Sequence, residues 1–222
     1  MKHITFYLDF ISPYAWLAFE QLPQALMGQT YSVTYKPILF AALLKHHGQL
    51  GPAEIPGKRE WTYRQVQWLA HTQGVDLQLP TTHPFNPLGL LRLAVACGLG
   101  DGASGLVPGT SSRYVVESLF RHVWCSGEEA ASAGRLEAIT AQLSPGSDVH
   151  GDEVKALLKA NTDEAILRGV FGVPTMAVDD KFFWGQDALP LLAAYLAGDA
   201  WFDGPAWQAA SQLRVGVSRP KP

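Results

Sequence analysis

The chain has 222 residues, of which 47% are hydrophobic and 17% are charged, and its formal net charge is −3. This composition is typical of a globular protein of one or two domains that buries a full core. The near-neutral charge gives no electrostatic basis for binding nucleic acid or an anionic membrane. No apolar run reaches the roughly 18 residues that span a bilayer. The N-terminus lacks the features of a signal peptide, so we expect a cytoplasmic protein.

The first 40 residues alternate strand, helix and strand. β-Forming residues alternate over 3–10 and again over 31–38, which predicts two strands. Between them, apolar residues recur at three- and four-residue steps from Tyr14 to Leu26, and Pro13 suits the first turn of a helix. A strand–helix–strand unit of this length favours parallel strands.

The middle of the chain, from about Phe40 to Leu158, shows helical periodicity and no convincing strand. Serine is a favoured N-cap residue, and Ser111 or Ser112 is predicted to cap one of these helices. Helices are predicted over 59–73, 88–97 and 113–124, with less regular helical stretches over 128–143 and 152–159.

β-Character returns near the C-terminus. Asn161 and the acidic residues that follow it predict the start of a short helix. Residues 175–178 and 181–184 predict a hairpin whose turn is an Asp-Asp pair. A final helix is predicted over 186–196, and the aromatic residues beyond Gly198 indicate that the tail packs against the body.

The order of these elements predicts an α/β fold. We expect a thioredoxin-like domain of residues 1–40 and 159–222, with an all-helical domain of residues 41–158 inserted after its second strand.

Ser12 stands at the start of the first predicted helix, directly after the first strand. A thiol–disulfide enzyme of thioredoxin type carries Cys-x-x-Cys there, whereas this chain has Ser12 and Ala15 at the two cysteine positions. A hydroxyl replaces the reactive sulfur and no resolving thiol follows, which nearly excludes a disulfide oxidoreductase. No nucleophile-elbow motif surrounds the serine and no histidine stands out as its base, which argues against a hydrolase triad. Helix capping alone also explains a serine at this position.

The Val173-Pro174 pair immediately precedes a predicted strand, where thioredoxin-like proteins keep a cis-proline. Such a turn exposes the Val173 backbone beside the first helix, and a peptide-like ligand can pair with it as an added strand. The alternative is an ordinary loop proline. Gln186 and Asp187 follow the hairpin, and Asp187 either favours the helix dipole or receives a ligand ammonium group. Together with Ser12, these residues predict a site for a thiol tripeptide.

Three other patterns in the sequence are interpreted as having no catalytic or binding role. The glycines of 100–105 match a dinucleotide-binding pattern but follow a helix, which indicates a loop. His46 and His47 have no further ligand nearby, so no metal site is predicted. Cys97 and Cys125 form no redox or metal motif and are expected to be reduced, mostly buried thiols.

Several segments resemble the 2-hydroxychromene-2-carboxylate isomerase family, which is close to the kappa-class glutathione transferases. The likeness runs from residue 1 to about 197 and implies a glutathione-dependent isomerase, usually a homodimer, with a thioredoxin fold and a helical insert. The matching segments are FYLDFISPYAW (6–16), KP (36–37), FNPL (85–88), GVFGVPT (169–175) and FWGQD (183–187).

Carried over by position, the resemblance implies that Ser12 faces the sulfur of glutathione and that the Val173-Pro174 turn pairs with its cysteinyl backbone. It implies that Gln186 and Asp187 hold the γ-glutamyl end.

Two more residues, Gln49 and Lys58, fall near positions that the family uses for the remainder of glutathione. The chain departs from the family at Gln186 and Ala188, where the family often has asparagine and arginine around the shared aspartate, and at Gln65, where an aspartate is frequent. These departures concern the second substrate more than glutathione.

The implied reaction interconverts 2-hydroxychromene-2-carboxylate and trans-o-hydroxybenzylidenepyruvate, small aromatic substrates of hydrocarbon catabolism, by reversible addition of the glutathione thiolate. Ser12 is expected to donate a hydrogen bond to that thiolate and not to act as a nucleophile. Two alternatives stay open: a kappa-like transferase that conjugates electrophiles, and a non-catalytic glutathione-binding module in which Ser12 only caps its helix.

Overall fold

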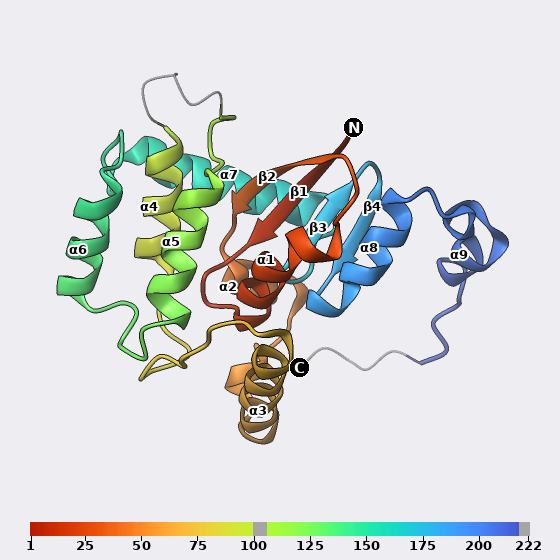
Figure 1. Ribbon diagram of the computed structural model, residues 1–222, viewed down its shortest axis with the longest axis horizontal. Coiled ribbons are helices and arrows are strands. Elements are labelled where there is room, and N and C mark those ends of the chain that lie inside the picture. Colours follow the sequence, from red (N-terminus) through yellow and green to blue (C-terminus); the bar gives the residue numbers. More distant parts are fainter. Residues whose placement is uncertain (100–105, 218–222) are drawn as a thin grey trace.

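The computed structural model describes residues 1–99 and 106–217, and it places a mixed sheet between two layers of helices (Figure 1). Strands β1 (Lys2–Leu8), β2 (Tyr31–Pro37), β3 (Thr175–Val178) and β4 (Lys181–Trp184) lie in the order β2-β1-β3-β4. β1 and β2 are parallel, whereas the β1–β3 and β3–β4 pairs are antiparallel. The predicted strand–helix–strand unit and the predicted hairpin are therefore both confirmed.

The helices include the stretches predicted over 59–73, 88–97, 113–124, 128–143 and 152–159, with shifted ends. They are α1 (Pro13–Ala25), α2 (Phe40–His47), α3 (Pro56–Gln73), α4 (Leu88–Gly98), α5 (Arg113–Trp124), α6 (Ala133–Leu143), α7 (Asp152–Leu167), α8 (Leu189–Leu196) and α9 (Pro205–Ala210). Short 3-10 turns lie at η1 (Pro52–Glu54), η2 (Gln186–Ala188) and η3 (Ala200–Asp203).

The single helix predicted over 186–196 is instead the η2 turn followed by α8. Pro190 explains the change, because it has no N–H to donate to the Gln186 carbonyl as a continuous α-helix requires.

Each face of the sheet is covered by its own helices. Ile4, Phe6 and Leu8 point from β1 into the larger core, which α1 and α8 help to form. Tyr7 and Ala177 point to the opposite face, into a smaller cluster with residues of α2 and α7. In Figure 1, α4, α5 and α6 stand beside β2, and α3 extends below the sheet.

Aromatic side chains join α5 to the beginning of α1. The Phe10 and Phe120 rings meet edge-on with centroids 5.0 Å apart, and the Trp124 Nε1 donates to the Phe10 carbonyl at 3.0 Å. Phe10, Phe120 and Trp124 are fully buried. Removing one such ring typically costs about 3–5 kcal/mol. The chain between β1 and α1 is therefore packed firmly against the helical part of the protein.

α7 runs unbroken from Asp152 to Leu167, so the prediction that a short helix starts at Asn161 is wrong. Asn161 is typical of a helix start when its side chain caps the helix. Here the Asn161 amide is buried and donates to the carbonyls of Pro37 (3.1 Å) and Gly109 (2.6 Å). α7 also passes through the predicted boundary at 158–159, and the division into two domains stays a prediction.

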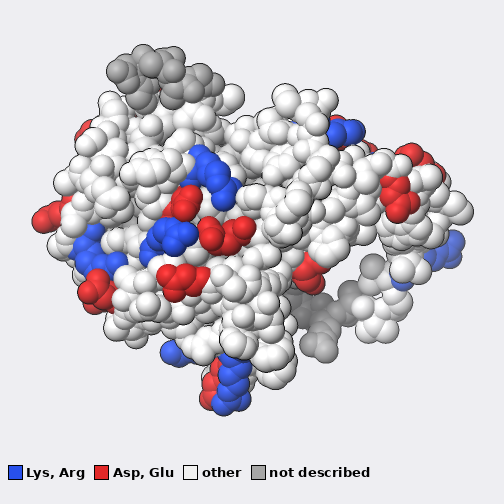
Figure 2. Space-filling view, in the orientation of Figure 1, with Lys and Arg blue, Asp and Glu red and all other residues white. Residues whose placement is uncertain are grey.

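The molecular surface mixes charges of both signs. Figure 2 shows acidic and basic side chains interleaved near the middle of one face. Arg121 accounts for two ion pairs of the described surface, with Glu117 at 3.1 Å and Glu20 at 3.7 Å. Among the described residues, no helix is both long and apolar enough to cross a membrane. The glycine pattern of 100–105 lies outside the described residues.

Candidate functional site

Ser12 is the N-cap residue of α1. Its backbone is extended (φ −92°, ψ 114°), its Oγ accepts a hydrogen bond from the Ala15 N–H at 3.2 Å, and Pro13 begins the helix. The residue is 7% exposed, at the point where the chain turns from β1 into α1. Ser12 therefore does cap the helix, as the simplest interpretation of the sequence holds.

The Ser12 hydroxyl also has a second hydrogen-bond partner, which lies far from it in the sequence. The Oγ donates its proton to the Val173 carbonyl at 3.3 Å, a longer contact than the 2.7–2.8 Å usual for a hydroxyl donor. The structure thus brings together two residues that the sequence analysis placed at one site. A long hydrogen bond is a weak one, so the hydroxyl proton is available to a stronger acceptor.

The turn at Val173-Pro174 has the cis peptide bond expected for it. It is anchored on its far side, where the Gly185 N–H donates to the Pro174 carbonyl at 3.0 Å. Val173 is 7% exposed and packs into the smaller core cluster. Within the described chain, the Val173 N–H has no hydrogen-bond acceptor. The turn therefore keeps one backbone donor for an added strand.

Gln186 and Asp187 lie in η2, which packs against α1. Gly185 leads into this turn with φ 97° and ψ 162°, a conformation that is essentially restricted to glycine. Burial raises the pKa of Tyr14, and the negative charge of Asp187 raises it further, so Asp187 lies near the first turn of α1. The structure therefore brings the predicted γ-glutamyl contacts to the same end of α1 as Ser12.

Gln49 and Lys58 are both exposed. Gln49 follows the C-terminus of α2, and Lys58 lies in the first turn of α3. In the described part of the chain, no hydrogen bond or ion pair joins either side chain to Ser12, Val173 or Asp187. Their role in binding glutathione stays a prediction.

Gln65, one of the departures from the family pattern, faces the site from α3. Its Oε1 accepts a hydrogen bond of 2.7 Å from the Tyr14 hydroxyl. Tyr14 lies two residues after Ser12, so α3 contacts the first turn of α1 through this pair.

Sequence reasoning missed His83. Its Nε2 lies 2.7 Å from the Ile11 carbonyl, and its Nδ1 lies 2.7 Å from the Tyr63 hydroxyl. His83 therefore forms a hydrogen bond with the residue before Ser12. Among the described residues, no histidine forms a hydrogen bond with Ser12 itself. Its position just before the FNPL segment was the only sequence signal that pointed to it.

Asp9 was also missed, although it lies within the FYLDFISPYAW segment. Its carboxylate is fully buried and accepts from the Ile11 N–H at 3.1 Å and from the Phe40 N–H at 2.9 Å. Burial raises the pKa of Asp9 to about 7, although the N–H groups of Phe40 and Ile11 act in the opposite direction. Asp9 thus ties the turn before α1 to the start of α2.

No described hydrogen bond joins Cys97 or Cys125 to Ser12, Val173 or Asp187. Cys97 and Cys125 are unpaired and half-buried, and burial raises the pKa of each thiol to about 11. These thiols are protonated at neutral pH and are poor nucleophiles. Across residues 1–99 and 106–217, no group of three or more histidine, cysteine, aspartate or glutamate side chains is arranged to hold a metal.

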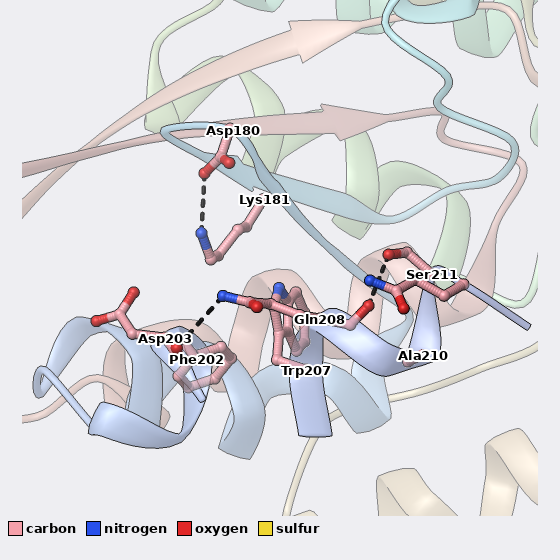
Figure 3. A pocket seen from close by; sticks show the side chains of 9 residues that line it. Asp180, Lys181, Phe202, Asp203, Trp207, Gln208, Ala210 and Ser211 are labelled. Atoms are coloured by element: carbon pink, nitrogen blue, oxygen red, sulfur yellow. Dashed lines mark hydrogen bonds and ion pairs between the residues drawn. The ribbon is translucent and has the colours of Figure 1, made fainter. Parts of the chain in front are cut away.

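Two hollows of the described surface lie elsewhere, and the first of them is near the C-terminus. It has a volume of about 720 Å³ and is lined by the β3–β4 turn and the C-terminal segment, including the Asp180–Lys181 ion pair, Trp207 and Gln208 (Figure 3). A second hollow of about 400 Å³ lies at the end of α3. Neither lining includes Ser12, Val173 or Asp187, so the candidate site is a surface at the end of the sheet and not one of these hollows.

The fold and the site together define a thioredoxin-like protein in which a serine stands where a reactive cysteine would begin α1. A model of the DSBA-like thioredoxin domain family matches residues 3–197, and the chain belongs to that family.

Relatives and solved structures agree with this assignment. The chain is 28% identical to glutathione S-transferase kappa 2 of Caenorhabditis elegans, over 92% of this chain and 95% of that protein. It is also 28% identical to a 2-hydroxychromene-2-carboxylate isomerase of Sphingobium xenophagum, over 88% and 98%. A solved structure of 2-hydroxychromene-2-carboxylate isomerase superposes with a TM-score of 0.72 at 21% identity, covering 96% of this chain and all of the other. The predicted fold and resemblance are thereby confirmed.

Proposed function

We propose that this protein is a glutathione-dependent isomerase that interconverts 2-hydroxychromene-2-carboxylate and trans-o-hydroxybenzylidenepyruvate. The observation that carries the proposal is the contact between the Ser12 hydroxyl and the Val173 carbonyl at the N-terminus of α1. It joins a hydroxyl donor, a helix N-terminus and a backbone N–H that no described residue accepts from, all in one place. The names of the relatives favour the same chemistry, since they are isomerases of this kind and glutathione transferases.

Glutathione has a chemical group for each part of the site. Its sulfur lies against Ser12, and its cysteinyl backbone pairs with Val173 beside Pro174, where the Val173 N–H has no acceptor among the described residues. Its α-ammonium group is received by Asp187 with the help of Gln186. Gln49 and Lys58 are assigned to the remaining glycine end, where a lysine suits a carboxylate.

The site lowers the pKa of the bound thiol. A free thiol with a pKa of about 8.5 is only a few per cent ionised at neutral pH. A helix N-terminus stabilises an anion by about 0.3–1 kcal/mol, and by about 2 kcal/mol in sheltered places. A hydrogen bond to a charged group adds about 1.5–3 kcal/mol. At about 1.4 kcal/mol per unit, the sum lowers the pKa by about two units, with Ser12 supplying the larger part.

The thiolate then acts as a covalent catalyst. The cyclic hemiketal first opens: its ring C–O bond breaks, the hemiketal hydroxyl becomes the ketone, and its proton goes to the phenol oxygen. The thiolate sulfur then forms a bond to the ring-side carbon of the cis double bond, and the π electrons move onto the conjugated carbonyl oxygen. The former double bond is now single and rotates. The electrons return, the carbon–sulfur bond breaks, and the thiolate leaves unchanged. Glutathione is thus a cofactor, and a small aromatic keto acid is the substrate.

The test is Ser12→Ala, with the pKa of bound glutathione measured from the thiolate absorbance. We expect the thiol pKa to rise by at least one unit because the hydroxyl donor is lost. Ser112→Ala is the matched control, because Ser112 caps α5 in the same way, accepting from the Val115 N–H at 3.3 Å. An unchanged thiol pKa in Ser12→Ala would contradict the proposed role.

The second candidate is a kappa-like transferase, which the match to the Caenorhabditis elegans relative favours equally by identity. The same thiolate would then attack an electrophile and lose a leaving group, and glutathione would be consumed. Comparing product formation from chlorodinitrobenzene with isomerisation of the chromene carboxylate separates the two. A homodimer and a cytoplasmic location belong to this proposal as expectations from the resemblance.

A further inference from the structure

Ile11, the residue before Ser12, is held on both sides of its backbone. Its N–H donates to the Asp9 carboxylate at 3.1 Å, and its carbonyl lies 2.7 Å from the His83 Nε2. Two side chains that come from different parts of the sequence thus fix the peptide groups on either side of Ile11. Since the second of these groups is the Ile11–Ser12 peptide, its orientation decides where the Ser12 side chain starts.

The hydrogen bonds allow only one arrangement of the neutral His83 ring. A carbonyl can only accept, so the Nε2 facing Ile11 carries the proton. The Nδ1 is then an acceptor, and the Tyr63 hydroxyl donates to it at 2.7 Å. Burial lowers the pKa of His83, which favours this neutral form. The same hydroxyl lies 3.2 Å from the His83 carbonyl. Tyr63 belongs to α3, so a residue of the helical part holds the ring in the tautomer that the Ile11 carbonyl selects.

Packing holds the His83 ring in this orientation. Its centroid lies 5.5 Å from the Trp124 ring, and Trp124 itself donates to the Phe10 carbonyl one residue earlier. The Phe85 ring meets the His83 ring edge-on, with centroids 5.9 Å apart. A ring held by neighbours on these sides cannot turn away from Ile11 without displacing them.

We propose that His83 is a positioning residue for the Ser12 hydroxyl, acting through the Ile11 carbonyl. This inference rests on the proposed function, because it concerns the stabilisation of a glutathione thiolate at Ser12. Electrostatic stabilisation depends on donors that are oriented before the charge develops, and a small change in the direction of a donor weakens it. His83 does not touch the sulfur; it keeps the turn in the conformation from which the hydroxyl does.

The experiment measures the pKa of glutathione bound to the parent and to His83→Leu and His83→Gln. Leucine removes the donor to Ile11, and the thiol pKa is expected to rise by about half a unit while kcat/KM falls about fivefold, the effect of one ordinary hydrogen bond. Glutamine keeps an N–H donor at a similar reach and is expected to restore both values. The KM for glutathione should change little, because Val173 and Asp187 are untouched.

His122 provides the matched control. It is another half-buried histidine whose Nε2 faces a backbone carbonyl, that of Ala130 at 2.9 Å, and burial lowers its pKa as well. His122→Leu is expected to lower the melting temperature and leave the thiol pKa unchanged. If His83→Leu does the same, His83 is only structural and the inference is wrong.

Tyr63→Phe extends the test in case His83→Leu does not fold. It leaves the imidazole in place but removes the hydroxyl that contacts its Nδ1 and holds the ring against the turn, and a raised thiol pKa supports the inference whereas the parent value contradicts it. A parent protein that fails to bind glutathione overturns both the proposed function and this inference. A shift in Ser12→Ala without any shift in His83→Leu or Tyr63→Phe overturns the inference alone.

Discussion

The N-termini of α1 and α5 are capped alike but connected differently. Each begins with a serine whose Oγ accepts a hydrogen bond from the N–H three residues on, at 3.2 Å for Ser12 and 3.3 Å for Ser112. Ser12 alone of the two also donates to the backbone of a distant turn, at Val173. Its neighbour Ile11 is fixed by Asp9 and His83. A cap stabilises a helix wherever it occurs, whereas a cap with a proton directed at a peptide-binding turn can also stabilise a ligand.

The largest expected effect is a difference in isomerase activity between variants of these two serines. Ser12→Ala is expected to lower kcat/KM for isomerisation about 10- to 100-fold, because it removes a hydrogen bond to a charged group. Ser112→Ala is expected to cost about 1 kcal/mol of stability, the usual value of a cap, with activity retained. Steady-state kinetics and urea unfolding of both variants check this, and equal activity losses would remove the distinction between the two helices.

Asp9 lies beside the N-terminus of α1, and its titration is expected to make the free energy of unfolding depend on pH. Its folded pKa of about 7 lies above the value of about 3.9 in an unfolded chain. Its stabilising contribution is therefore complete below the unfolded pKa and is lost as the pH rises through about 7. We expect this contribution to fall by about 2 kcal/mol between about pH 5 and pH 8.

The measurement for Asp9 compares urea unfolding of the parent and Asp9→Asn across that pH window. The difference between the two curves isolates Asp9 from the histidines that titrate in the same range. Asp152→Asn serves as the control, because the Asp152 carboxylate is exposed at the start of α7. Parallel curves for the parent and Asp9→Asn would show that this carboxyl does not titrate as described.

Gly185→Ala tests whether glutathione binding depends on the backbone conformation at the start of η2. A Cβ at this position would lie 2.3 Å from the Asp187 Oδ1 and would require a backbone conformation that alanine avoids. We expect glutathione affinity to fall about tenfold, since roughly 1.4 kcal/mol of strain or displacement at Asp187 is enough. Gly198→Ala is the control, with φ 81° and no atom within 4 Å of the new Cβ. Calorimetric titration should show weaker binding for the first variant only.

The smallest expected effect concerns the charge of Asp187. An exposed ion pair contributes about 0.2–1 kcal/mol, so Asp187→Asn is expected to raise the KM for glutathione about threefold, and less at high salt. Asp203→Asn alters an exposed carboxylate in the large C-terminal hollow and is expected to leave KM unchanged. Equal KM values for the two variants would exclude Asp187 as the ammonium contact.

Local patterns in the sequence were sufficient for the thioredoxin-like elements. The alternation of β1 and β2, the hairpin around its Asp-Asp turn and the positions of Ser12, Val173 and Asp187 all follow from residues near one another in the chain. The convergence of these three residues needed the topology of the fold, which the thioredoxin-like order of the predicted elements supplied.

Long-range polar contacts could not be predicted in this way. His83 and Asp9 act through backbone groups of Ile11 and Phe40, and a backbone group has no sequence signature that pairs it with a distant side chain. The helix start predicted at Asn161 was wrong for the same reason. An asparagine is typical of a helix N-cap, whereas the Asn161 side chain donates to two carbonyls of other segments. Tertiary contacts override local preference wherever a polar side chain is buried.

The amide of Asn161 limits how the protein can move. It fastens the middle of α7 to the end of β2 at Pro37 and to the loop at Gly109. A hinge that swung the helical part away from the sheet would have to bend α7 or leave a buried amide without acceptors, at a cost of about 1–3 kcal/mol for each group. Access to Ser12 is therefore expected to depend on movements of side chains and of α3, and not on the opening of two rigid halves.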